Sequence, residues 1–255
     1  MNELFDVSGR LAFVTGSSRG LGRSLALALA QAGARVVLHG RDEAALEETR
    51  AALVEATGAD VSWVSFDVMD AGAVEQGVSG LVAEHGVPDV LVNNAGLQSR
   101  APFTEFAVSD WDRVIASNLS SAFYVSRFVT PGMAERGSGK VINIGSVQSV
   151  LARQTIAPYS ASKGGVVMLT KGMAADLARF DVQVNAISPG YFATEMNRAL
   201  VEDEAFNAWL IARTPAQRWG DFRELWGTLI YLASDASSFV SGQNILVDGG
   251  MTAVV

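Results

Sequence analysis

The sequence predicts an α/β protein built on a single doubly wound parallel sheet of the Rossmann type, with about seven strands and helices on both faces. Short runs rich in Val, Ile and Leu alternate with helix-length segments along the chain. These runs are almost continuously apolar, which is typical of strands buried on both faces. Hydrophobic residues make up 49% and charged residues 18% of the 255 residues, which is enough apolar material for a large core.

Seven apolar runs are predicted as strands, and the segments between them as helices. The strands are expected at residues 11–15, 35–39, 61–66, 89–93, 140–144, 182–187 and 244–247. The helices are expected at residues 21–32, 42–57, 71–84, 111–136, 159–180 and 222–233. A strand that is followed by a helix and then by a second strand is the pattern of a parallel crossover connection.

Residues 1–255 are predicted as a single domain, because no linker rich in Pro, Gly or Ser divides the chain. The segment 190–220 is longer than the other connections, and loops much beyond about 12–15 residues are usually functional. A short helix at residues 205–212 is expected within it. We therefore interpret this segment as a lid over a ligand site.

Composition excludes several classes of function. The chain has no cysteine, a formal net charge of -8 and no cluster of Lys and Arg, so neither a disulfide framework nor nucleic-acid binding is expected. No apolar run approaches the roughly 18–20 residues of a membrane helix, and no secretory signal pattern is present. His39 and His85 lack metal-ligand companions, so no metal is expected. A soluble, cytoplasmic protein is the simplest expectation.

A glycine-rich turn follows the first predicted strand and opens the first predicted helix. Glycines let the chain turn tightly and let a pyrophosphate approach the backbone, while the helix N-terminus offers unpaired N–H groups. The G-x-x-x-G-x-G spacing also suits a plain strand-to-helix turn, but the strand–turn–helix context favours a dinucleotide. The residues predicted to contact this cofactor are Gly16, Ser18, Arg19, Gly20, Leu21 and Gly22.

The end of the second predicted strand indicates which dinucleotide is bound. An acidic side chain at this place binds the adenosine ribose of NAD, but here Gly40 and Arg41 occupy it. Arg19 in the glycine-rich turn is expected at the same corner, and two guanidinium groups suit a 2′-phosphate. Alternatively, Arg41 and Asp42 are only the solvated start of a helix, with Asp42 as its N-cap. NADP is predicted over NAD.

Polar residues follow the third and fourth predicted strands, where ligands of open α/β sheets bind. Asp67, with Val68 beside it, is expected at the adenine. Asn94, Ala95 and Gly96 are expected to pack against the adenosine, although Asn-Asn-Ala-Gly alone is also an ordinary turn.

Four polar residues form a candidate acid/base set: Asn118, Ser146, Tyr159 and Lys163. Tyr159 and Lys163 are four residues apart and share one helix face. A free phenol has a pKa of about 10, and a nearby ammonium is expected to lower the pKa of Tyr159. Ser146 follows the fifth predicted strand, where its hydroxyl can reach the reacting oxygen. The Tyr-x-x-x-Lys pair alone is more often an ordinary helix pair, so the prediction depends on the whole set.

Together these residues resemble the short-chain dehydrogenase/reductase family over residues 11–250, almost the whole chain. The resemblance implies that Tyr159 transfers a proton, Ser146 orients the substrate oxygen, and Lys163 binds the nicotinamide ribose. It further implies that Asn118 holds a water linking Lys163 to solvent and that Thr194, after Pro189 and Gly190, contacts the carboxamide. It also implies a homotetramer, with residues 111–136 and 159–180 as the main interface.

Several segments are similar to a subgroup of the family, the bacterial gluconate 5-dehydrogenases, which interconvert D-gluconate and 5-keto-D-gluconate with NADP(H). The similar segments are 97–102, 146–149, 152–153, 189–196 and 213–220. Ser99 departs from the pattern expected there, in which an Arg stands beside Arg100. A small sugar acid needs a cation and several hydrogen-bonding groups, and Arg100, Gln148 and Arg153 are predicted to contact it together with Ser146 and Tyr159.

Other interpretations stay open. Arg100 and Arg153 can equally be exposed or lie between subunits. The substrate can be a related acid of the 2-keto-3-deoxygluconate type, or the chain can be a 3-oxoacyl-thioester reductase. A catalytically silent dinucleotide-binding protein is the alternative of a different class. The complete set of four acid/base residues argues against it.

Overall fold

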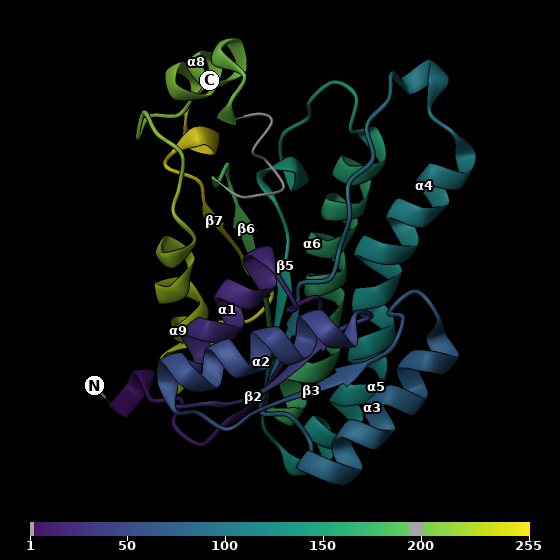
Figure 1. Cartoon of the computed structure of the whole chain (residues 1–255), viewed down its shortest axis with the longest axis vertical. Helices are drawn as coiled ribbons and strands as arrows, with labels where there is room; N and C mark the ends of the chain where they lie inside the picture. Colours follow the sequence, from purple (N-terminus) through teal and green to yellow (C-terminus); the bar gives the residue numbers. More distant parts are fainter. Residues whose placement is uncertain (1–2, 194–200) are drawn as a thin grey trace.

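The computed structural model describes residues 3–193 and 201–255, and its centre is one parallel sheet of seven strands in the order β3-β2-β1-β4-β5-β6-β7 (Figure 1). The strand order reverses between β1 and β4, so the predicted doubly wound fold class is confirmed. The strands are β1 (Leu11–Val14), β2 (Arg35–Gly40), β3 (Val61–Ser65), β4 (Val90–Asn93), β5 (Gly139–Ile144), β6 (Val182–Pro189) and β7 (Asn244–Val247).

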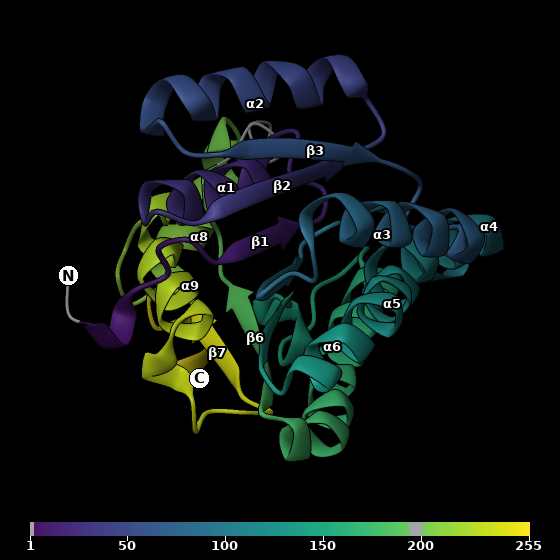
Figure 2. The same cartoon turned by 90° about the horizontal axis from the view of Figure 1, so that it is seen from below.

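Helices cover both faces of the sheet, as Figure 2 shows. One face packs against α1 (Gly20–Gln31), α2 (Glu43–Thr57) and α9 (Trp226–Ala233), and the other against α3 (Ala71–His85), α5 (Ser121–Arg136) and α6 (Ala157–Leu177). Residues of β1 alternate between the two cores: Val14 packs with the first group of helices and Phe13 with the second. This double burial explains why the strands lack a polar face. In the described residues, no helix is both long and apolar enough to cross a membrane.

The register of the central strands brings the predicted site residues to one edge. Val14 of β1 is level with Leu38 of β2 and with Val92 of β4. The loops that leave these three strands therefore start side by side at the carboxyl edge of the sheet. Ligands of doubly wound folds bind outside this edge, at the point where the strand order reverses.

The predicted helix 111–136 is wrong as a single α-helix. The chain forms α4 (Val108–Ile115), a π-helical turn (Ala116–Ser120) and then α5. The side chain of Asn118 bonds to neighbouring segments from within this turn, and one wide turn re-aims a side chain without ending the helix. The short helix expected in the 190–220 segment is confirmed as α8 (Glu204–Arg213), which lies beyond the carboxyl ends of β6 and β7 (Figure 1).

Candidate active site

The glycine-rich turn is packed tightly against the loop that follows β4. Gly16 has a φ of 62°, and a Cβ atom there would lie 2.9 Å from Cα of Ala95. The Asn94 side chain donates to the carbonyl oxygens of Thr15 and Gly16 at 2.9 and 3.0 Å. Gly20 has a φ of 57°, and no atom lies within 4 Å of the position of its missing Cβ. The turn is thus closely packed against the protein at Gly16 and leaves free space at Gly20, the N-terminus of α1.

The corner at the end of β2 holds an ion pair. A guanidinium nitrogen of Arg41 lies 3.4 Å from Oδ2 of Asp67, and both side chains are solvent-exposed to a large extent. Asp42 accepts a hydrogen bond from the backbone N–H of Ala45 and caps α2, so the expected N-cap is confirmed. Arg19 is exposed at the N-terminus of α1. The structure thus brings Arg41 to the predicted adenine contact, Asp67, and leaves its guanidinium accessible to solvent.

The four candidate acid/base residues come together beside β5. Asn118 accepts a hydrogen bond from the N–H of Leu97 at 2.8 Å and donates to the carbonyl oxygen of Leu97 and to Oγ of Ser162. The Lys163 ammonium donates to the carbonyl oxygen of Ile144 at 2.7 Å and lies 5.7 Å from the centre of the Tyr159 ring. The Ser146 hydroxyl lies near enough to the Tyr159 hydroxyl to affect its pKa. Asn118 therefore joins the loop after β4 to α6, next to Lys163.

Burial controls the protonation of this set. Burial raises the pKa of the Tyr159 phenol, while the nearby Ser146 side chain acts in the opposite direction. Burial also lowers the pKa of Lys163 to about 8. The expected net lowering of the pKa of Tyr159 is therefore wrong here, because the loss of hydration outweighs the effects that favour the phenolate. Tyr159 is held as a protonated group, which suits a proton donor.

Two cations lie near the acid/base set. A guanidinium nitrogen of Arg153 lies 3.5 Å from the hydroxyl of Tyr191, and its guanidinium carbon is 4.7 Å from the centre of the Phe206 ring. Partial burial and then the positive charge of Arg153 lower the pKa of Arg100. Since Tyr191 lies near enough to Arg100 and to Tyr159 to affect the pKa of each, these side chains lie in one region. Two like charges held close together favour an anion between them.

Gln148 adds an unpaired acceptor to the same region. Its side chain is 7% exposed, and its Oε1 atom has no hydrogen-bond partner in the part of the chain that the structure describes. Its backbone N–H donates to the Ser146 hydroxyl at 3.2 Å. A buried oxygen without a donor is costly, so a hydroxyl group of a ligand or a water is expected to satisfy it.

An aromatic cluster, formed by Tyr191, Phe206, Trp209 and Trp219, ties α8 to the end of β6. The Tyr191 ring centre lies 5.8 to 6.2 Å from those of the other three residues. Sequence reasoning assigned no role to these aromatic residues. The only signal was their concentration in one long loop. Because the Arg153 guanidinium stacks on Phe206, the cluster links the predicted lid to a predicted substrate contact.

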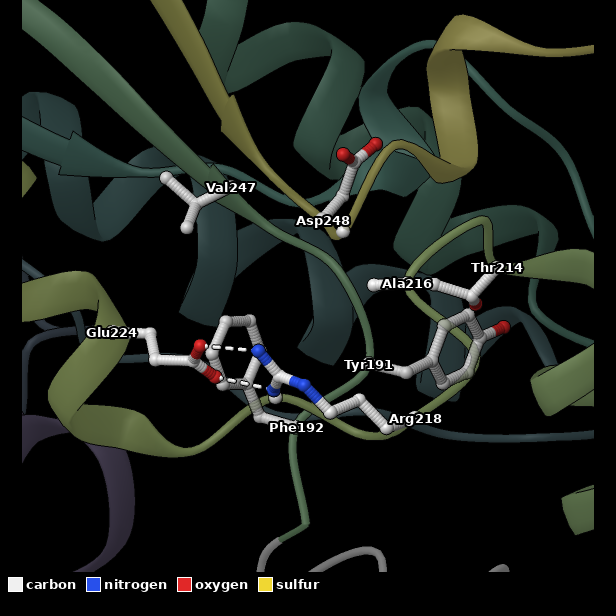
Figure 3. A pocket seen from close by; sticks show the side chains of 10 residues that line it. Tyr191, Phe192, Thr214, Ala216, Arg218, Glu224, Val247 and Asp248 are labelled. Carbon is white, nitrogen blue, oxygen red and sulfur yellow. Dashed lines mark hydrogen bonds and ion pairs between the residues drawn. The ribbon is translucent and has the colours of Figure 1, made fainter.

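A second set of contacts lies at the two ends of the predicted lid, and Figure 3 shows the contact of Arg218 with Glu224. Arg218 forms two hydrogen bonds to the carboxylate of Glu224, at 2.6 and 2.8 Å, beside a cavity of about 70 Å³. At Gly190, a Cβ atom would lie 2.7 Å from Cα of Asp248, so the chain after Pro189 approaches the end of β7 closely. The predicted carboxamide contact, Thr194, lies outside the described residues.

Comparison with known proteins identifies relatives along the whole chain. The family model described as enoyl-(acyl carrier protein) reductase, a model of the short-chain dehydrogenase/reductase type, matches residues 16–252. The gluconate 5-dehydrogenase of Gluconobacter oxydans 621H is 51% identical, with 98% of this chain and 97% of that protein covered. The 5-keto-D-gluconate 5-reductase of Escherichia coli K12 is 49% identical over the full length of both. A solved gluconate 5-dehydrogenase of Burkholderia cenocepacia J2315, in complex with NADP and tartrate, has a TM-score of 0.96 and 49% identity, with 99% of each chain covered.

Proposed function

Because the chain belongs to the short-chain dehydrogenase/reductase family, we propose that it is an NADP-dependent oxidoreductase that interconverts D-gluconate and 5-keto-D-gluconate. One observation carries the proposal: Tyr191 contacts the cation Arg153 and lies near enough to Arg100 and Tyr159 to affect the pKa of each, so a phenol with a raised pKa shares its surroundings with two cations. The pair of cations suits the carboxylate of a sugar acid, and Tyr159 suits its carbonyl oxygen. Relatives of about 50% identity bear the names of enzymes for this substrate pair.

The carboxyl edge of the sheet fits a dinucleotide phosphate. The open space at Gly20, the N-terminus of α1 and the exposed Arg19 and Arg41 offer N–H groups and positive charge for phosphates. We propose that Asp67 and Val68 contact the adenine and that Asn94, Ala95 and Gly96 pack against the adenosine. When bound, NADPH supplies the hydride.

The protein residues move the proton. In the direction of reduction, the Tyr159 hydroxyl donates its proton to the carbonyl oxygen of the substrate, and the Ser146 hydroxyl orients that oxygen by a hydrogen bond. The Lys163 ammonium lies near the phenolate that results and stabilises its charge. Asn118 fixes the position of the helix that carries Lys163, through Ser162. Gln148 accepts a hydrogen bond from a substrate hydroxyl.

A panel of substrates tests the proposal. With NADPH, turnover of 5-keto-D-gluconate is expected to exceed that of 2-keto-3-deoxygluconate and of an acetoacetyl thioester, as followed by the loss of NADPH absorbance. A preference for the deoxy acid would assign the chain to the related sugar acid. A preference for the thioester would overturn the sugar-acid proposal. NADPH binding without turnover of any of them would indicate a silent dinucleotide-binding protein.

Substitution of Arg41 tests the choice of cofactor. In Arg41→Ala, the KM for NADPH is expected to rise about 10-fold or more, because a charged hydrogen bond to a phosphate contributes roughly 1.5–3 kcal/mol. The KM for NADH is expected to change less than about twofold, since NADH lacks that phosphate. Steady-state kinetics with both cofactors measures the two values. Equal effects on NADPH and NADH would mean that Arg41 does not contact the 2′-phosphate.

The pH dependence of reduction follows from Lys163. Since burial lowers its pKa to about 8, the ammonium is lost as the pH rises through 8, and kcat for reduction is expected to fall there. The free energy of unfolding changes in the opposite direction. Below about pH 8 the buried ammonium destabilises the folded protein, and this destabilisation is lost as the pH rises from 8 to the ordinary pKa of 10.5. Lys163 therefore cannot cause the decline by unfolding the protein. Lys163→Arg should shift the decline to higher pH, and an unchanged profile would contradict the assignment.

We further propose a homotetramer in the cytoplasm. Large apolar side chains are exposed on the helices that the family resemblance places at the interface: Val108 and Trp111 on α4, Phe123 on α5 and Met168 on α6, with 42–76% of their surface accessible. Large exposed apolar side chains on these helices favour contact with another protein surface. Light scattering after size-exclusion chromatography should give four times the mass of the chain. The cytoplasmic location is inferred from the absence of cysteine alone.

A further inference from the structure

His39 is a buried histidine to which the proposed mechanism assigns no role. It is the penultimate residue of β2, its side chain is 2% exposed, and its ring centre lies 4.3 Å from that of Phe66 and 6.1 Å from that of Phe13. The two aromatic rings restrict the plane of the imidazole. Burial lowers the pKa of His39 to about 4, so the ring is neutral under ordinary conditions.

Both ring nitrogens of His39 have backbone partners in cofactor segments. The backbone N–H of Gly16 donates to Nδ1 at 3.2 Å, and Nε2 lies 3.2 Å from the carbonyl oxygen of Phe66. A backbone N–H can only donate and a carbonyl oxygen can only accept. The proton must therefore be on Nε2, which fixes one tautomer. One imidazole thus connects the glycine-rich turn after β1 with the end of β3, directly before Asp67 and Val68.

The hydrogen bond to His39 changes the role of Gly16. Its N–H is used within the protein, so it contributes to the turn through its backbone conformation and its lack of a side chain. The backbone of His39 makes further contacts that any residue can provide: its carbonyl accepts from the N–H of Ser17 at 2.8 Å, and its N–H donates to Oγ of Ser17 at 2.9 Å. The two ring contacts are therefore what a histidine adds at this position.

We propose that His39 is a positioning residue for the adenosine half of the cofactor, which sets the glycine-rich turn and the Asp67 segment at a fixed separation through its neutral ring. This inference rests on the proposed dinucleotide site. A ligand that spans both segments, with its pyrophosphate at the turn and its adenine at Asp67, binds best when their separation is fixed beforehand. The substrate region around Arg100 and Tyr159 is formed by other loops and does not depend on this connection.

Three variants test the proposal: His39→Phe, His39→Asn and, as a control, His85→Asn at the end of α3, where the ring bonds Ser62 and neither cofactor segment. His39→Phe keeps an aromatic ring but loses both hydrogen bonds, and it is expected to raise the Kd for NADPH and for 2′,5′-ADP about tenfold. The KM for the keto acid at saturating NADPH should change less than about twofold. His39→Asn restores an acceptor near the place of Nδ1 and should recover most of the affinity. His85→Asn should match the wild type.

The outcomes separate the positioning role from a purely structural one. A lower Tm with an unchanged Kd in His39→Phe would overturn the proposal, as would a His39→Asn variant that binds as weakly as His39→Phe. If the wild type binds neither NADPH nor 2′,5′-ADP, both the proposed function and the role of His39 are overturned. The tautomer can be tested on the wild type, without any variant. Nitrogen NMR should show His39 neutral and protonated on Nε2 at pH 6. A charged ring or the other tautomer would overturn the assignment even where His39→Phe does not fold.

Discussion

Replacing Tyr159 by Phe is expected to reduce kcat about 10³-fold, because a positioned general acid contributes roughly 10²- to 10⁴-fold to a rate. The substitution removes one oxygen atom and keeps the ring, so the Kd for NADPH should stay within about twofold of the wild-type value. Stopped-flow measurement of single turnovers and fluorescence titration with NADPH measure the two quantities. The combination of lost chemistry and retained cofactor affinity is what distinguishes an acid/base residue from a packing residue.

Tyr231 provides the matched control for this experiment. It lies on α9, on the other face of the sheet from α6, and Tyr231→Phe should change neither kcat nor the Kd. If Tyr159→Phe kept more than a tenth of the wild-type kcat, another group would have to donate the proton. Ser146, whose side chain lies near the Tyr159 hydroxyl, would then be the first residue to examine.

The second large effect is expected at Gly22, in the first turn of α1. A Cβ atom at this position would overlap with the carbonyl group of Gly16 and with Nδ2 of Asn94, which are themselves joined by a hydrogen bond. Because one neighbour is backbone and the other is a side chain held by a hydrogen bond, neither can move aside freely, and α1 would have to move. Overpacking of this kind costs about 1–3 kcal/mol. Gly22→Ala should lower the free energy of unfolding by that amount and also abolish NADPH binding, as measured by denaturant titration and fluorescence.

Gly80 in α3 is the matched control, because no atom lies within 4 Å of the position that its Cβ would take. Gly80→Ala should raise the free energy of unfolding by about 0.5–1 kcal/mol, since alanine loses less backbone entropy than glycine in a helix. A Gly22→Ala variant as stable as Gly80→Ala would show that the glycine-rich turn tolerates a shift of α1. The close packing of Gly22 would then not be required for the fold.

Residues with local signals were predictable from the sequence, and those that depend on distant partners were not. The alternation of strands and helices fixes which loops meet at the carboxyl edge, so Gly16, Asn94 and Ser146 could be placed together without coordinates. The π-helical turn was missed because one additional residue in a helix barely changes its apolar periodicity. The bonds of His39 reach 23 and 27 residues along the chain, and no pattern in the sequence connects these partners.

The protonation of the site was predictable only in part. Sequence spacing places Tyr159 and Lys163 on one helix face, but the pKa of each depends on how much water the folded protein excludes. Lys163 also donates to the carbonyl oxygen of Ile144, nineteen residues earlier. Ile144 lies outside the helix, so the spacing of charged residues along the helix does not reveal this contact. The aromatic cluster around Arg153 is a tertiary contact of the same kind.

The ion pair between Arg41 and Asp67 has a consequence for protein engineering. With the role proposed for Arg41, conversion to NADH calls for an acid at this position, because an acidic side chain there binds the ribose of NAD. In this chain Arg41→Asp would place a second carboxylate beside Asp67, where a cation now lies 3.4 Å away. Two neighbouring acids repel each other and favour protonation of one of them. A redesign of coenzyme preference should therefore change both positions at once, with Asp67→Asn accompanying the new acid.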